Sequence, residues 1–151
     1  MVEMKKIAVS VLAVLMALTT VIGMAGCGDS KEEQLLNAYV MSSDFQSDLK
    51  SMQRSASGNA TVTPQVSGRK LTFVFKMSKQ LTELEINTMK LQINSNIDSI
   101  LGGNDFSEMV QEIREKTAIQ FPMIGIEMYN MDNSAIVKLE YDSQTMQTKV
   151  L

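Results

Sequence analysis

Hydrophobic and polar residues alternate along the chain with two periods, of three to four residues and of two, which predict helices and strands respectively. The first helical pattern begins at a capping box in residues 30–33 and runs to Met52. A second capping signature, in residues 43–46, predicts a break near Ser42. Residues 55–59 are rich in Ser, Gly and Asn, so the helix should end there.

A β-hairpin is predicted next, because two short alternating runs flank residues 67–70. Its apolar positions are Ala60, Val62, Pro64 and Val66, then Leu71, Phe73, Phe75 and Met77. Gly68 can take the positive φ of a type II′ turn. Pro64 has no N–H to donate, which predicts that the first strand lies at a sheet edge.

The clearest helical pattern follows a third capping box, Thr82 to Glu85. Its apolar stripe consists of Ile86, Met89, Ile93, Ile97, Ile100 and Leu101. We expect this stripe to be the main helical face of the core. Gly102 and Gly103 should end the helix, and Asn104 or Asp105 should cap a shorter one. That second stripe consists of Phe106, Met109, Val110 and Ile113.

A closing hairpin is predicted on either side of a two-residue turn at Asp132-Asn133. This turn would set Ile124, Ile126 and Met128 opposite Tyr141, Leu139 and Val137, with Glu127 opposite Lys138. A four-residue loop at 130–133 would keep the same faces but place Glu127 opposite Ile136. The nine residues after Asp142 carry little pattern, and we expect them to fray.

These elements predict an α+β fold in the order α-ββ-αα-ββ. An antiparallel sheet made of the two β-hairpins, four strands in all, would be packed on one face by the amphipathic helices. We expect the hairpins to join, because joining removes two exposed sheet edges.

Residues 1–26 have the three parts of an export signal. Lys5 and Lys6 are basic, residues 7–18 are apolar, and residues 23–26 are small or flexible. The alternative, a transmembrane helix, needs about 20 apolar residues, and Ser10 and the glycines of this segment interrupt such a span. Met4 fits the start of a signal peptide better than Met1, because Glu3 is out of place before the two lysines.

Residues 24–27, Met-Ala-Gly-Cys, resemble the lipobox of bacterial lipoproteins, with Met24 where an aliphatic residue is usual. The resemblance implies that Cys27 receives a diacylglyceryl group and becomes the new N-terminus. Residues 27–151 would then form a single globular domain, lipid-anchored on the extracytoplasmic face of the cell membrane, since two acyl chains hold a protein there stably. A buried structural cysteine is the alternative for Cys27.

Charge and composition exclude several function classes. Removal of Glu3, Lys5 and Lys6 leaves 12 basic and 16 acidic side chains, and the only basic cluster is Arg69-Lys70 at a predicted turn. Nucleic acid is therefore not an expected partner. The chain has no histidine and one cysteine, which excludes His-based triads, internal disulfides and Cys/His metal sites.

Three further patterns could carry chemistry. Glu127 and Glu140 are the best pair of carboxylates for a hydrolase, although both fall on the polar phase of their strands. Asp132, Asn133 and Asp142 could supply oxygens to calcium, but their spacing matches no known loop motif.

The third pattern is the set of nine methionines in the mature chain, which could form an adaptable binding groove. We expect most of them in the core, Met77, Met89, Met109 and Met128 among them, and Met131 outside.

As a whole the chain resembles small lipoproteins of Gram-positive Firmicutes that carry a domain of unknown function. The resemblance rests on the lipobox, on the strand patterns at residues 71–75 and 126–130, and on the order of the elements. It implies a Gram-positive cell surface and no assigned activity. We therefore expect a non-enzymatic binding module with no catalytic residue, metal or cofactor and with an envelope or membrane protein as partner; an envelope-associated hydrolase using surface carboxylates is the alternative.

Overall fold

The structure is a computed structural model that describes residues 30–56, 58–101 and 104–151, with only the backbone described for 97–101 and 104–106. Along the described chain the elements are α3 (Lys31–Val40), α4 (Ser43–Ala56), β1 (Ala60–Ser67), β2 (Lys70–Met77), α5 (Glu83–Leu101), α6 (Asn104–Thr117), β3 (Met123–Tyr129), β4 (Ala135–Asp142) and β5 (Gln147–Val150).

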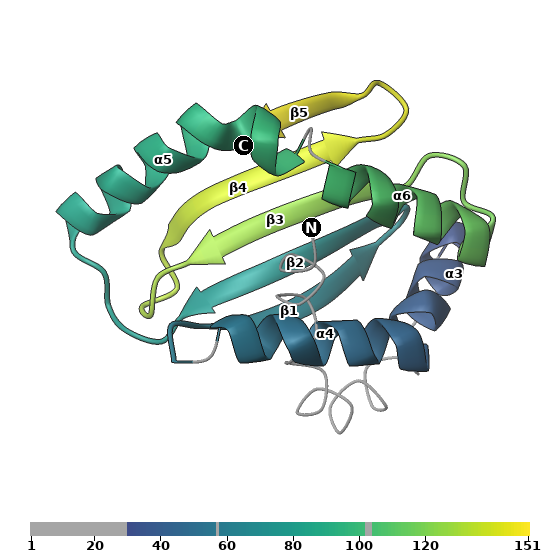
Figure 1. Ribbon diagram of the computed structural model, residues 1–151, viewed down its shortest axis with the longest axis horizontal. Helices are drawn as coiled ribbons and strands as arrows, with labels where there is room; N and C mark the ends of the chain where they lie inside the picture. Colours follow the sequence, from purple (N-terminus) through teal and green to yellow (C-terminus); the bar gives the residue numbers. More distant parts are fainter. Residues whose placement is uncertain (1–29, 57, 102–103) are drawn as a thin grey trace.

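The strands form one mixed sheet in the order β1-β2-β3-β4-β5 (Figure 1). Neighbouring strands are antiparallel except β2 and β3, which run parallel with Leu71 beside Ile124. The predicted α+β class is confirmed, and so is the edge position of β1. The parallel joint follows from the connection between β2 and β3, which contains two helices and is long enough to return the chain to the same end of the sheet.

The expected four-strand, fully antiparallel sheet is wrong in two respects. The joint between the hairpins is parallel, and residues 147–150 form a fifth strand where fraying was expected. The order is αα-ββ-αα-βββ. Strand β5 lies at a rim of the sheet, where three of its four residues are exposed, so it lacks the apolar alternation that identifies a half-buried strand.

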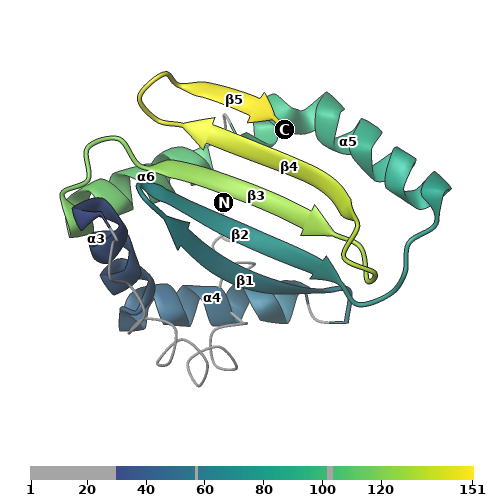
Figure 2. The same ribbon diagram turned by 180° about the vertical axis from the view of Figure 1, so that it is seen from behind.

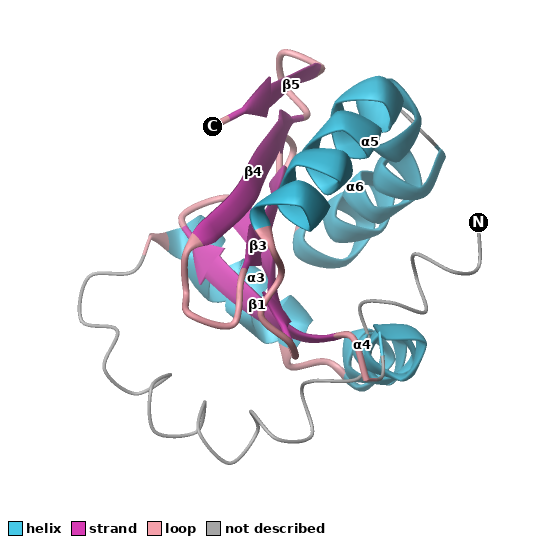
Figure 3. Ribbon diagram, turned by 90° about the vertical axis from the view of Figure 1, so that its left-hand side faces the viewer, coloured by secondary structure: helices cyan, strands magenta, loops and turns pink. Residues whose placement is uncertain are grey.

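Helices α4, α5 and α6 lie on the same side of the sheet (Figure 3), and α3 packs against α6, β1 and β2. The core between these layers is apolar. Its most buried members are Leu36, Leu49, Val62, Leu71, Phe73, Ile113 and Ile124. The opposite face of the sheet, seen in Figure 2, is covered by no described helix.

The stripe on α5 is not the main helical face of the described core, contrary to expectation. Among residues 83–96 no side chain is buried; Ile86, Met89 and Ile93 are half-exposed, and only Ile93 packs against the central cluster. Helices α3, α4 and α6 contact the strands β1, β2 and β3, whereas α5 contacts β4 and α6. The remaining members of the stripe, Ile97, Ile100 and Leu101, lie outside the described side chains.

The break between the first two helices is confirmed, one residue earlier than the capping signature indicates. The Ser42 hydroxyl accepts a hydrogen bond from the Phe45 N–H (3.4 Å), so Ser42 and not Ser43 caps α4. The buried Gln46 side chain donates to the Val40 carbonyl at the end of α3 (2.7 Å). These bonds satisfy backbone groups that both helix ends leave open.

The register of the β3–β4 hairpin is confirmed, but its turn is not. Glu127 pairs with Lys138 and Met128 with Val137, as predicted, and then a bulge shifts Tyr129 to Ala135. The loop is a turn from Asn130 to Asn133, in which Asn133 has φ 67°, closed by the Asn130 N–H bond to the Ser134 carbonyl. The bulge lets the consecutive side chains of Ile136 and Val137 both be buried.

Candidate functional site

The expected lipid site, Cys27, lies outside the described residues. The described chain begins three residues later at Ser30, whose hydroxyl caps α3 by accepting from the Glu33 N–H (3.2 Å). The Glu33 carboxylate accepts from the Gly68 N–H (2.6 Å), which ties the start of α3 to the β1–β2 turn.

That turn has positive φ at Gly68, as a type II′ turn requires. Among the described helices, none combines the length and apolar character needed to cross a bilayer.

The carboxylate pair singled out for catalysis lies on the open face of the sheet, with each member engaged by a lysine. Glu127 accepts a hydrogen bond from the Tyr129 hydroxyl (2.5 Å) and lies 3.8 Å from the Lys138 ammonium. The same ammonium lies 5.3 Å from the centre of the Tyr129 ring. The Tyr129 hydroxyl and then the Glu127 charge raise the pKa of Lys138. These contacts keep the lysine charged and hold Glu127 as an acceptor.

Glu140 is bound to Lys70 across the middle strand of the sheet. The Lys70 Nζ and a Glu140 carboxylate oxygen are 2.9 Å apart, although the residues lie on β2 and β4 with β3 between them. The β3 residue beside Glu140 is Gly125. A Cβ at Gly125 would lie 2.6 Å from the Thr72 hydroxyl oxygen. The Thr72 side chain therefore occupies the space that a side chain at position 125 would need.

Arg69 and Lys70, the basic cluster at the β1–β2 turn, both form ion pairs. The Arg69 guanidinium donates to both carboxylate oxygens of Asp142 (3.2 Å each) and to the Phe121 carbonyl (2.5 Å). The bond from Arg69 lowers the pKa of Asp142 below its usual value. The only basic cluster within residues 27–151 therefore links the β1–β2 turn to the end of β4 and to the segment before β3.

The calcium ligands considered from sequence do not meet. Asp132 and Asn133 lie in the loop before β4, and Asp142 ends β4. Asp132 accepts from the backbone N–H and hydroxyl of Ser134, and Asp142 holds Arg69. Across residues 30–56, 58–101 and 104–151, no group of three His, Cys, Asp or Glu side chains is placed to hold a metal ion.

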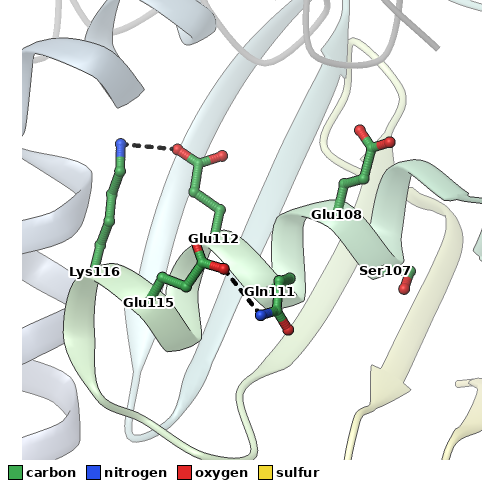
Figure 4. A pocket seen from close by; sticks show the side chains of 6 residues that line it. All are labelled: Ser107, Glu108, Gln111, Glu112, Glu115 and Lys116. Carbon is green, nitrogen blue, oxygen red and sulfur yellow. Dashed lines mark hydrogen bonds and ion pairs between the residues drawn. The ribbon is translucent and has the colours of Figure 1, made fainter.

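A shallow depression of about 530 Å³ lies along α6, and sequence reasoning missed it (Figure 4). Its described lining comes from this one helix: Ser107, Glu108, Gln111, Glu112, Glu115 and Lys116. Lys116 pairs with Glu112 and with Asp44 of α4, each at 3.1 Å. The signal in the sequence was the run of glutamates at steps of three and four residues, which share one helix face.

Glu112 also borders the buried Tyr39 of α3. Burial, and then the nearby Glu112 carboxylate, raise the pKa of Tyr39 far above its usual value. Tyr39 further packs edge-on against Phe45 (ring centres 5.2 Å apart). The charged groups beside this depression thus join α3, α4 and α6 to one another.

The methionines form no common surface among the described residues. Met109 and Met128 pack against the core and Met131 is exposed, as expected. Met77 and Met89, also expected in the core, are only partly buried and are not part of the core cluster. Met41 and Met146 are exposed, contrary to expectation, and lie in different connecting segments from Met131.

The largest exposed apolar side chains within a described helix are Leu84 and Leu91 of α5, exposed by 77% and 70%. Sequence reasoning passed over them because they lie opposite the stripe. Seven residues apart, they fall nearly in line along the outer side of the helix.

A family model described as "Domain of unknown function (DUF4854)" matches residues 36–141. No curated protein and no solved structure matches the chain.

Proposed function

The chain belongs to the family of the domain of unknown function DUF4854, and we propose from the surfaces of its structure that it is a non-enzymatic binding module. In this proposal a lipid on Cys27 holds the domain at the outer face of the cell membrane, where it binds an envelope or membrane protein. The lipid anchor rests on the lipobox resemblance and on the export signal before it.

The observation that carries the binding role is the position of α5. None of its described side chains is buried, and Leu84 and Leu91 point into solvent. This helix of 19 residues contacts mainly β4 and α6, and the outer surface of its described part is free to meet another protein. Burial of two leucines in an interface contributes about 1.5–3 kcal/mol each, enough to matter for a specific complex.

The alternative, a hydrolase using surface carboxylates, finds less support in the geometry. A general acid needs a carboxyl group that can hold a proton near neutral pH, which requires burial or a second carboxylate nearby. Glu127 and Glu140 are instead partly exposed on the sheet surface, and each is paired with a lysine rather than with a second carboxylate.

The test is recovery of a partner from the native membranes by the full-length lipidated chain. We expect one stoichiometric envelope protein with the wild type and a loss of at least about tenfold with the double variant Leu84→Ser/Leu91→Ser, since 1.4 kcal/mol is tenfold in affinity. The control is Asn87→Ser/Asn94→Ser, which alters exposed polar positions on the same helix.

Two results would contradict the proposal. One is equal recovery by both double variants. The other is hydrolysis of an envelope polymer by the purified chain that Glu127→Gln or Glu140→Gln abolishes, which would establish the hydrolase instead.

A further inference from the structure

The two edge strands of the sheet, β1 and β5, differ in whether their outward-facing backbone groups have hydrogen-bond partners. At β1 the outward backbone groups are occupied: the Gln53 side chain of α4 accepts from the Val62 N–H (3.1 Å) and donates to the Ala60 carbonyl (3.4 Å). Two residues further, Pro64 has no N–H to offer. This edge is closed to another strand.

The rim at β5 is open. The Leu151 N–H donates to the Lys138 carbonyl (2.8 Å), which fixes the alternation of the β4–β5 ladder. In an antiparallel ladder every second residue turns its N–H and C=O away from the partner strand. Those residues are Thr148 and Val150, which stand opposite Tyr141 and Leu139. No described strand continues the sheet beyond β5 (Figures 1 and 2).

The side chains of β5 indicate which kind of strand could pair with this edge. Val150 lies on the helix-covered side of the sheet, paired with the buried Leu139, yet it is 55% exposed. A neighbouring strand with an apolar residue on that side would cover it. On the other side Lys149 is opposite Glu140, but Lys70 already occupies that carboxylate, and Lys149 has no ion pair among the described residues.

We propose that the β5 edge binds an extended peptide segment of a partner protein, with an acidic residue on the Lys149 side and an apolar residue on the Val150 side. The added strand would bond to the N–H and C=O groups of Thr148 and Val150. This inference rests on the proposed binding function and names a second contact surface for it, apart from α5.

A second copy of this chain fits the edge less well. Strand β5 has four residues, so symmetric pairing would bring the two Lys149 side chains opposite or diagonal to each other on one face. Like charges at such positions destabilise a strand pair, whereas an acidic residue there stabilises it.

The experiment uses the full chain, purified in detergent, and phage-displayed random dodecapeptides as the probe. Peptides selected on the wild type should carry Asp or Glu alternating with apolar residues. Thr148→Pro removes an N–H that points away from β4, so it blocks the edge without removing a β4–β5 bond, and it should weaken the selected peptides at least about tenfold. The matched control Thr148→Ala keeps the N–H and should bind within about twofold. Lys149→Glu should select basic residues instead.

Amide exchange on the wild type provides a test that needs no variant. Bound peptide should slow exchange at Thr148 and Val150 by about tenfold or more and leave Lys149, which already bonds within the ladder, unchanged. Equal binding to Thr148→Pro, protection elsewhere, or a wild-type dimer abolished by Thr148→Pro would overturn the proposal. None of these results bears on the Leu84/Leu91 test, so the peptide edge can fail while the binding function stands.

Discussion

The side-chain amide of Asn130 bonds to both backbone groups of Leu81, 49 residues earlier in the chain. Its Oδ1 accepts from the Leu81 N–H (2.8 Å), and its Nδ2 donates to the Leu81 carbonyl (3.1 Å). Asn130 is 1% exposed and Leu81 is buried. This pair attaches the segment that leads into α5 to the β3–β4 hairpin.

Replacement of Asn130 by alanine should therefore lower the free energy of unfolding by roughly 2–5 kcal/mol, because two buried backbone groups lose their partners. The exposed bond between Gln80 and Asp132 lies beside this pair and provides the control. Asp132→Ala should cost less than about 1 kcal/mol in the same urea titration. Similar losses for the two variants would show that the Asn130 bonds are not the anchor.

Helix α6 should contribute more to the stability of the hydrophobic core than helix α5 does. Ile113 is fully buried, whereas Ile93 is half-exposed, so Ile113→Ala should cost roughly 2–5 kcal/mol and Ile93→Ala less than half as much. Chemical denaturation of both variants gives the comparison. A larger loss at Ile93 would mean that α5 is the principal core helix after all.

A methyl group at Gly125 should be poorly tolerated. Its contact with the Thr72 hydroxyl at 2.6 Å should cost about 1–3 kcal/mol in Gly125→Ala. Thr72→Ala removes the atoms in the way, so the double variant should be more stable than the sum of the two single losses predicts. Strict additivity in this double-mutant cycle would show that the two positions do not interfere.

The Arg69–Asp142 ion pair should make the stability of the fold depend on pH in the acid range. The pKa of Asp142 is lowered in the folded chain, so the pair stabilises the fold above the unfolded pKa of about 4, and this contribution disappears as the pH falls through the folded value. Asp142→Asn should flatten the loss of stability below pH of about 4, measured as urea midpoints. Arg69→Gln should flatten it equally, and an unchanged slope in both variants would contradict the assignment.

The anchor is tested by Cys27→Ala. This change removes both the acyl acceptor and the processing signal, so we expect release from the membrane fraction or retention of the uncleaved precursor. Fractionation with mass spectrometry of the N-terminus distinguishes these from the wild type. Membrane retention together with normal maturation in the variant would contradict the lipoprotein hypothesis.

Local alternation was enough to predict the hairpins and even the Glu127–Lys138 register, because a slip of one residue would turn every apolar side chain outward. It was not enough for β5, whose exposed side chains follow no pattern. Nor could it predict how deeply the α5 stripe is buried. Periodicity shows which face of a helix is apolar, but it does not show how much of the sheet the other helices already cover.

The site residues failed for a related reason. Arg69 and Lys70 form their ion pairs with Asp142 and Glu140, 73 and 70 residues later in the chain. The sequence shows two like charges at a turn. It does not show that parallel pairing of β2 with β3 places the acidic residues of β4 beside them. Asn130 reads as an ordinary turn residue until the segment before α5 is in place beside it.

The parallel joint also sets the order of events when the chain folds. Each hairpin closes over a few residues, and the helix caps are local, but β2 and β3 meet only after the 45 residues between Met77 and Met123 have been gathered. Loop closure of that length costs entropy before any contact compensates for it. The rate-limiting step should therefore be the meeting of two preformed halves, and until then both strands of the joint present bare edges to other chains.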